Sequence, residues 1–236
     1  AEGQKRKCRA QDCGFGNPET LCERGKDRAL LRSAKALQEV RWQTDGEPRS
    51  RNGSAMELTG RRILLREFRQ SDVSALAAIH SDPCVLRYYA PEVGTLVHAR
   101  MLVEMFIQWA NEHPRQNFQL AIVVRETEVL VGSCGIRRKA CAPGKAEFGI
   151  GIGSVWWGKG IAHEAARIIL GFGFSELGVD QVSGVSVYEN EAVSKFARRL
   201  GFTPGSARPG EAWVRARNWS ALDWVLTCET WKELAG

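Results

Sequence analysis

The sequence predicts a mixed α/β domain that is built on one sheet of about seven strands. First, short apolar runs alternate with amphipathic stretches of helical length after Met56. Second, two of these runs follow each other across a short polar turn, which predicts a pair of adjacent antiparallel strands. Later runs are separated by helical stretches, which predicts helical crossover connections between strands. Third, a composition of 44% apolar and 25% charged residues suits one domain of ordinary size with an appendage.

Residues 1–55 are expected to form a basic N-terminal extension that is separate from a domain at 56–236. They hold twelve Lys or Arg and eight Asp or Glu, which is most of the net charge of +6. Apolar spacing over 27–42 predicts one amphipathic helix, and the stretch rich in Gly, Pro and Ser at 46–55 predicts a linker. Few aromatic residues lie among the basic residues of this extension, which argues against specific nucleic-acid binding.

The first half of the domain predicts three strands and two helices. The run RILLR at 62–66 is typical of a strand. Helices are expected after the capping signals Ser71-Asp72 and Thr95, since apolar residues follow each of them at helical spacing. The runs 118–124 and 129–136 are separated by four polar residues and therefore predict a hairpin.

The second half alternates strands with helices. In order, we expect a strand at 146–152, a helix at 161–177, a strand at 182–187, a helix at 191–200, and two late strands near 213–217 and 222–227.

The segment GIGIGSVWWGKG at 149–160 places five glycines just before a helix. Glycine weakens a strand and begins a helix poorly, so this density suggests that a ligand approaches the backbone. A dinucleotide fingerprint is excluded because Ser154 stands at its third glycine, and a P-loop is disfavoured because Gly160 stands where Ser or Thr holds magnesium. Open N–H groups at a helix start bind anions without a metal. An extended amide arm ending in a pyrophosphate, as in coenzyme A, fits this segment.

Four segments in order carry a resemblance to a known family. They are LTGRRILLREFRQSD (58–72), SDPCVLRY (81–88), AEFGIGIGSVWWGKGIAHEA (146–165) and VYENEAVSKFARRLGF (187–202). From about 57 to 233 the chain resembles the GNAT superfamily of acetyl-CoA-dependent N-acetyltransferases, and within it the RimJ/RimL branch that acetylates ribosomal proteins. Residues 1–55 lie outside the resemblance.

The resemblance implies a mainly antiparallel sheet whose fourth and fifth strands, 146–152 and 182–187, splay apart to admit the cofactor arm. It implies acetyl-CoA as cosubstrate, no metal, and direct transfer of the acetyl group to a primary amine. The residues that it places at the cofactor are Ile150, Gly151, Ile152, Trp157, Gly158, Lys159, Gly160, Ile161, Ala162 and Asn190. Two of these have simpler explanations as well: Trp157 could pack on the core, and Lys159 could be solvated.

The catalytic residues are less well defined, because the chain departs from the family at three positions. Val193 stands where the branch has a serine proton donor, Ala197 where many members have a tyrosine acid, and Val185 where some have a glutamate base. The remaining candidates are Glu147 as base, Tyr188 as acid and Ser194 as a second acid. Glu147 could instead point into water, and Tyr188 could be an ordinary aromatic residue at a strand end.

The acceptor amine is left open. It is a protein N-terminus or a small molecule such as an antibiotic or polyamine, and the three departures also allow a catalytically weak acyl-CoA-binding module. No run of eighteen apolar residues predicts a membrane span. Seven scattered cysteines without metal-ligand spacing, and a charged start, favour a cytoplasmic protein. A homodimer is compatible with the sequence.

Overall fold

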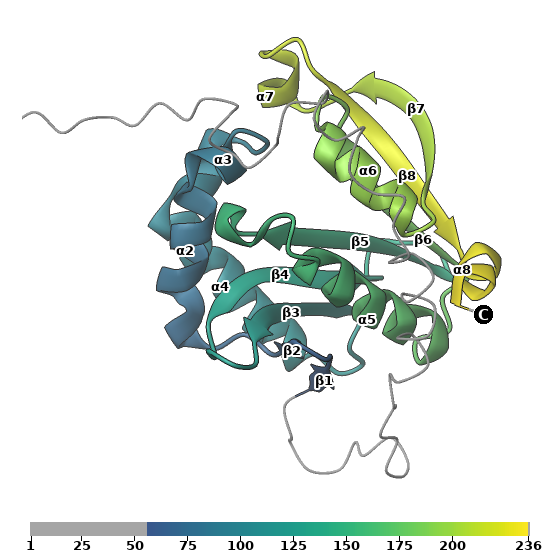
Figure 1. Cartoon of the computed structure of the whole chain (residues 1–236), viewed down its shortest axis with the longest axis horizontal. Helices are drawn as coiled ribbons and strands as arrows, with labels where there is room; N and C mark the ends of the chain where they lie inside the picture. The colour runs from purple at the N-terminus through teal and green to yellow at the C-terminus, as the bar shows by residue number, and fades with distance from the viewer. Residues whose placement is uncertain (1–55, 236) are drawn as a thin grey trace, which may run out of the picture. The chain divides into compact units, whose positions relative to one another are not determined.

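The computed structural model describes residues 56–235, which form an eight-stranded sheet in the order β1-β2-β3-β4-β5-β6-β8-β7 (Figure 1). The expected helix at 27–42 and linker at 46–55 lie outside the described residues. Within the described sheet, β5 and β6 pair in parallel and all other neighbours pair antiparallel. The strands are β1 (Glu57–Thr59), β2 (Ile63–Arg66), β3 (Asn117–Val124), β4 (Leu130–Arg137), β5 (Lys145–Ile152), β6 (Gln181–Val187), β7 (Thr203–Pro209) and β8 (Ser220–Thr227).

Helices cover both faces of this sheet (Figure 1). They are α2 (Val73–Ser81), α3 (Pro83–Leu86), α4 (Leu96–Ala110), α5 (Ile161–Ser175), α6 (Glu191–Arg199), α7 (Ala212–Arg215) and α8 (Cys228–Ala235), with 3-10 turns η2 (Gln70–Asp72), η3 (Pro91–Gly94) and η4 (Ser154–Trp156). Successive residues of a strand point to opposite faces. In β3, Leu120 and Ile122 therefore join the core beneath α5, and Ala121 and Val123 join the core beneath α2 and α4.

Two sequence predictions of the sheet need correction. The expected strand near 213–217 is wrong: its first residues form the single turn α7, in which Val214 is the buried residue. The strand that pairs with β8 at the edge of the sheet is instead β7. Its residues are all exposed and include Pro204 and Pro209. An edge strand of this kind has no alternation of buried and exposed residues, so its sequence carries no strand signal. The short β1 was also not predicted, and the sheet has eight strands rather than seven.

The remaining elements agree with the sequence predictions. The hairpin of β3 and β4, the strand β5, the long helix α5 and the pair β6 and α6 occur where they were expected, with shifts of two residues or fewer at their ends. The mixed, mainly antiparallel α/β class is therefore confirmed.

Candidate functional site

The parallel strands β5 and β6 separate along their length. Their pairing covers Lys145 to Glu147 on β5 and Gln181 to Ser183 on β6, whereas β5 continues to Ile152 and β6 to Val187. Past this pairing, the edge of β5 that faces β6 carries main-chain groups with no strand partner. The predicted splay between these two strands is therefore present.

The pairing of β5 with β4 determines which main-chain groups face the splay. The N–H of Gly153 donates to the carbonyl oxygen of Val131 at 2.9 Å, so the peptide groups of the alternate residues 151 and 149 also point to β4. The N–H and C=O groups of Ile150 and Ile152 consequently point into the splay. The Ile152 carbonyl oxygen already accepts a hydrogen bond from the indole N–H of Trp157 at 2.9 Å. Ile150 is therefore the predicted contact whose backbone is best placed for an extended ligand.

The loop that leads into α5 has an open helix start. Gly158 and Gly160 have φ angles of +71° and +76°, which L side chains rarely adopt. Gly160 is the N-cap of α5 and supplies no side-chain cap. The first N–H to find a helical acceptor is that of Glu164, which donates to the Gly160 carbonyl at 3.1 Å. The N–H groups of residues 161–163 are left without helical acceptors at the positive end of the helix, an arrangement that favours an anion.

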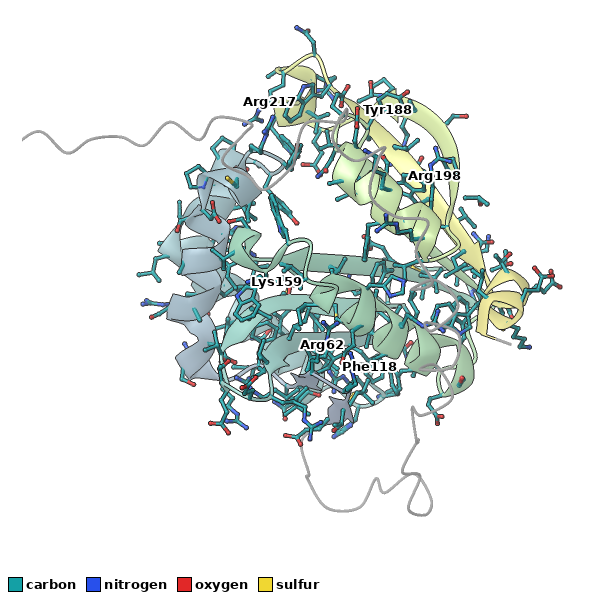
Figure 2. The ribbon with its side chains drawn as sticks, viewed as in Figure 1. Arg62, Phe118, Lys159, Tyr188, Arg198 and Arg217 are labelled. Carbon is teal, nitrogen blue, oxygen red and sulfur yellow. The ribbon has the colours of Figure 1, made fainter. Side chains whose placement is uncertain are left out.

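Arg62, a residue that the sequence analysis did not single out, holds this loop in place. Its Nη1 donates to the carbonyl oxygen of Lys159 at 2.8 Å, and its Nε donates to Glu164 Oε2 at 2.7 Å. Its backbone N–H donates to the other oxygen of Glu164 at 2.8 Å. Figure 2 shows Arg62 and Lys159 beside the start of α5. The pair also neutralises a carboxylate that would otherwise repel an anion at the helix start.

A basic cavity lies against the same loop. It measures about 370 Å³ and is lined by the cations Arg61, Arg62, Arg125 and Lys159, by the carboxylate of Glu126, and by apolar residues that include Trp156 and Ile161. The Lys159 ammonium lies 4.9 Å from the centroid of the Trp156 ring. Lys159 is exposed and thus available to a second anionic group next to the helix start.

The predicted cofactor contacts differ in exposure and in their place in the fold. Gly158, Lys159 and Gly160 are exposed on the loop, whereas Ile161 is buried and Trp157 packs against the core. Asn190 lies across the splay, at the end of β6, where its side-chain oxygen accepts the Val193 N–H at 3.2 Å and caps α6. This cap leaves the amide nitrogen of Asn190 as the group that can meet a cofactor arm.

Glu147 lies on β5 at the last residue that pairs with β6. Its Oε1 is 3.1 Å from Nη2 of Arg137, and Nη1 of Arg137 donates to the buried Gln119 at 3.1 Å. The Glu147 side chain is half exposed, so water reaches the carboxylate. It shares a face of β5 with Gly149 and Gly151, opposite α5.

The two predicted acids lie on the opposite wall. Tyr188 follows the end of β6, where its N–H donates to the Ser220 carbonyl at 2.9 Å, and its side chain is 55% exposed. In Figure 2 it is well separated from Lys159. Ser194 lies in the first turn of α6, with its N–H bonded to the Asn190 carbonyl at 3.1 Å. The structure therefore does not bring Tyr188 to the loop at 157–160, and it places Ser194 beside Asn190.

No group of three or more His, Cys, Asp or Glu side chains that could hold a metal occurs within residues 56–235. Across that same range, no helix is both long enough and apolar enough to cross a bilayer.

The acetyltransferase (GNAT) domain family matches residues 62–203 of this chain. The uncharacterized N-acetyltransferase p20 of Bacillus licheniformis is 31% identical over 142 residues, which cover 60% of this chain and 79% of that protein.

Two solved structures illustrate the likeness in fold. A ribosomal-protein-S5-alanine acetyltransferase from Vibrio fischeri has a TM-score of 0.63 at 13% identity, covering 75% of this chain and 98% of that one. The microcin C7 self-immunity acetyltransferase MccE, solved with acetyl-CoA and AMP, has a TM-score of 0.59 at 15% identity, covering 71% and 93%.

The family match covers more than half of the residues, so the chain belongs to the GNAT acetyltransferase family. It is an acetyltransferase, in line with the relatives that match it. Enzymes of this family use acetyl-CoA and act on amines. At the low identities of the solved structures, their likeness supports the fold and not a particular acceptor.

Proposed function

We propose that this acetyltransferase binds acetyl-CoA in the splay between β5 and β6 and transfers the acetyl group directly to a primary amine. The observation that carries the proposal is the combination of a strand edge open from Ile150 onward with an uncapped helix start at Gly160. An amide-bearing arm can pair with the first, and a pyrophosphate can accept bonds from the second. Coenzyme A has both parts in that order.

The basic cavity beside the loop supports the same assignment. Coenzyme A carries a third phosphate on its ribose, close to the pyrophosphate. Arg61 and Arg125 add positive charge to the cavity beside the start of α5. We assign the third phosphate to these two cations.

The proposed chemistry begins with an amine that must lose a proton before it attacks the thioester. Glu147, which water reaches, is the proposed base and acts through a water molecule. The carbonyl oxygen gains charge in the tetrahedral intermediate, and the Ile150 N–H is the proposed donor to it. Tyr188 and Ser194 stay candidates for supplying a proton to the departing thiol.

For the acceptor we propose a protein N-terminus, as in the RimJ/RimL branch. The four ordered segments that resemble this branch support this choice. A small-molecule acceptor is the second candidate, because acceptor pockets lie on loops that vary without changing the fold.

One assay tests the proposal and separates its alternatives. Thiol release from acetyl-CoA is followed with a panel of peptides, polyamines and aminoglycosides. We expect amine-dependent release with one class of acceptor. Binding of coenzyme A without release for any amine would favour the catalytically weak binding module, and the absence of binding would refute the proposal.

The role of Glu147 is tested by Glu147→Gln. Loss of a general base lowers turnover by roughly 10²-fold or more, while coenzyme A affinity persists. An unchanged rate and pH profile would remove Glu147 from the mechanism and leave positioning of a neutral amine as the main contribution.

We also propose that residues 56–236 hold the whole catalytic unit. A chain that begins at Met56 should keep the acetyl-CoA turnover and melting temperature of the full chain. Loss of either would show that residues 1–55 belong to the domain.

A further inference from the structure

The segment between α3 and η3 reaches both walls of the splay with adjacent tyrosines. The ring of Tyr88 stacks on Trp219 with centroids 6.0 Å apart, and Trp219 directly precedes β8, the strand that pairs with β6. The hydroxyl of Tyr89 lies 3.5 Å from the position that a Cβ of Gly151 on β5 would take. The Tyr89 hydroxyl is therefore held over the bare strand on the side of the splay away from α5.

The glycines of β5 make this approach available. Gly149 and Gly151 share the face of Glu147, so no β5 side chain separates the Tyr89 hydroxyl from the main chain of the strand. Ile150, between them, directs its peptide groups into the splay. An acyl group bound at Ile150 would therefore have the Tyr89 hydroxyl as a neighbouring polar group.

The surroundings of the Tyr89 hydroxyl favour its protonated form. Tyr89 as a whole residue is 37% exposed, but desolvation at its hydroxyl end raises the pKa of this phenol, which is protonated at pH 7. The ring of His80 stacks on it at 6.4 Å, and burial, together with His98, lowers the pKa of His80 to about 4, so this imidazole is neutral at pH 7. None of the hydrogen bonds found within residues 56–235 uses the Tyr89 hydroxyl. A proton donor is thus present over β5, beside the splay, without a protein acceptor among residues 56–235.

We propose that the Tyr89 hydroxyl donates a hydrogen bond to the thioester sulfur as it leaves. This assignment rests on the proposed function. The amine nitrogen forms its bond to the carbonyl carbon, the intermediate collapses, and the carbon–sulfur bond breaks with its electron pair on sulfur. The amine proton goes to Glu147 or water. Tyr89 keeps its own proton, because a phenol is a weaker acid than a thiol, and stabilises the thiolate until solvent protonates it.

Two measurements on Tyr89→Phe test the assignment, and the substitution removes one oxygen from a partly exposed ring. A hydrogen bond to a charged group contributes about 1.5–3 kcal/mol, so kcat should fall about 10- to 100-fold while the KM for acetyl-CoA stays within about threefold. In the second measurement, the thiol of bound coenzyme A is titrated through the ultraviolet absorbance of its thiolate. Its pKa should be higher in the variant than in the wild type by about one or more.

Tyr88→Phe is the matched control, because it removes the same atom one residue away and keeps the ring on Trp219. We expect it to leave kcat and the thiol pKa unchanged. A Tyr89→Phe variant with kcat within twofold of the wild type, an effect confined to KM, or an unchanged thiol pKa would each overturn the assignment. Failure of the wild-type chain to bind coenzyme A would refute the proposed function and this assignment together.

Discussion

The two strand-to-helix junctions at the mouth of the splay are built in opposite ways. After β6, Asn190 caps α6 with its own side-chain oxygen. After β5, Gly160 begins α5 in a left-handed conformation with no side-chain cap at all. The strands run parallel and the helices follow them in the same sense, so the difference does not arise from topology.

The comparison teaches that a missing cap can itself be a functional signal. A helix start without a cap leaves donors unsatisfied, and a capping side chain typically contributes about 1 kcal/mol to stability. α6 has this contribution. α5, the longer helix, which begins directly after the glycine loop at 158–160, lacks it, and the Arg62–Glu164 ion pair holds its start from the side. We infer that the ligand's pyrophosphate completes α5 as Asn190 completes α6.

The largest expected effect, a loss of coenzyme A affinity, comes from placing a carboxylate at the start of α5. Asp tolerates a positive φ better than most residues, and a Cβ at position 160 would lie 3.2 Å from Nη2 of Arg62, so Gly160→Asp should fold with its carboxylate beside Arg62 and close to the expected pyrophosphate. We expect coenzyme A affinity to fall about 100-fold or more, measured by calorimetry, because like charges then share one site. Gly160→Asn, with the same shape and no charge, should lose much less. Equal losses in both variants would point to strain rather than to charge.

A smaller effect is expected from a single methyl group on the loop. Gly158 has a φ of +71° and Gly178 has a φ of +62°, and a Cβ on either meets no atom within 4 Å. Each Gly→Ala change should therefore cost about 1 kcal/mol of stability. Coenzyme A affinity should fall about tenfold in Gly158→Ala and stay unchanged in Gly178→Ala. Similar affinities in the two variants would contradict the placement of the anion at residues 158–162.

The capped junction is tested by two substitutions at Asn190. Asn190→Asp keeps an oxygen for the Val193 N–H and removes the amide donor, so the melting temperature should hold while coenzyme A affinity falls several-fold. Asn190→Ala removes the cap as well, which should lower the melting temperature by about 2–4 °C. If Asn190→Asp binds as the wild type does, the side chain is a helix cap only.

The smallest expected effect concerns the ribose phosphate. The wild type should prefer acetyl-CoA over its analogue without that phosphate by about two- to fivefold in KM, since exposed charge pairs contribute about 0.2–1 kcal/mol. Arg61→Gln should remove most of this preference and leave turnover at saturation unchanged. A preference that survives the substitution would place the phosphate outside the basic cavity.

The elements that could be predicted from the sequence are those whose side chains are buried. β3 and β4 are buried almost throughout, and α5 buries one continuous stripe, so their apolar patterns were plain. The exposed β7 carries no such pattern, and its pairing is set by β8. The glycine segment was informative for a different reason, because a positive φ at Gly158 and Gly160 demands that residue type.

The site was predictable only where the backbone forms it. Arg62 and Tyr89 act across 97 and 62 residues of sequence, on Lys159 and Gly151 respectively, and nothing local in RILLR or RYY indicates either partner. Such contacts require the three-dimensional structure. The predicted roles of Tyr188 and Ser194 likewise depend on the width of the splay, which spacing along the chain does not determine.

The composition of β7 bears on how copies of this chain could meet. An edge strand offers a row of unpaired peptide groups to any other extended segment, which is the first step toward sheet-to-sheet aggregation. β7 has prolines at positions 204 and 209 and a register break between Pro204 and Ala207. Proline lacks an N–H and an irregular register disrupts a ladder, so this edge resists being extended. An association of two copies through a continuous sixteen-stranded sheet at β7 is therefore disfavoured, and the substitution of Pro204 by a β-branched residue such as valine would expose the chain to that association.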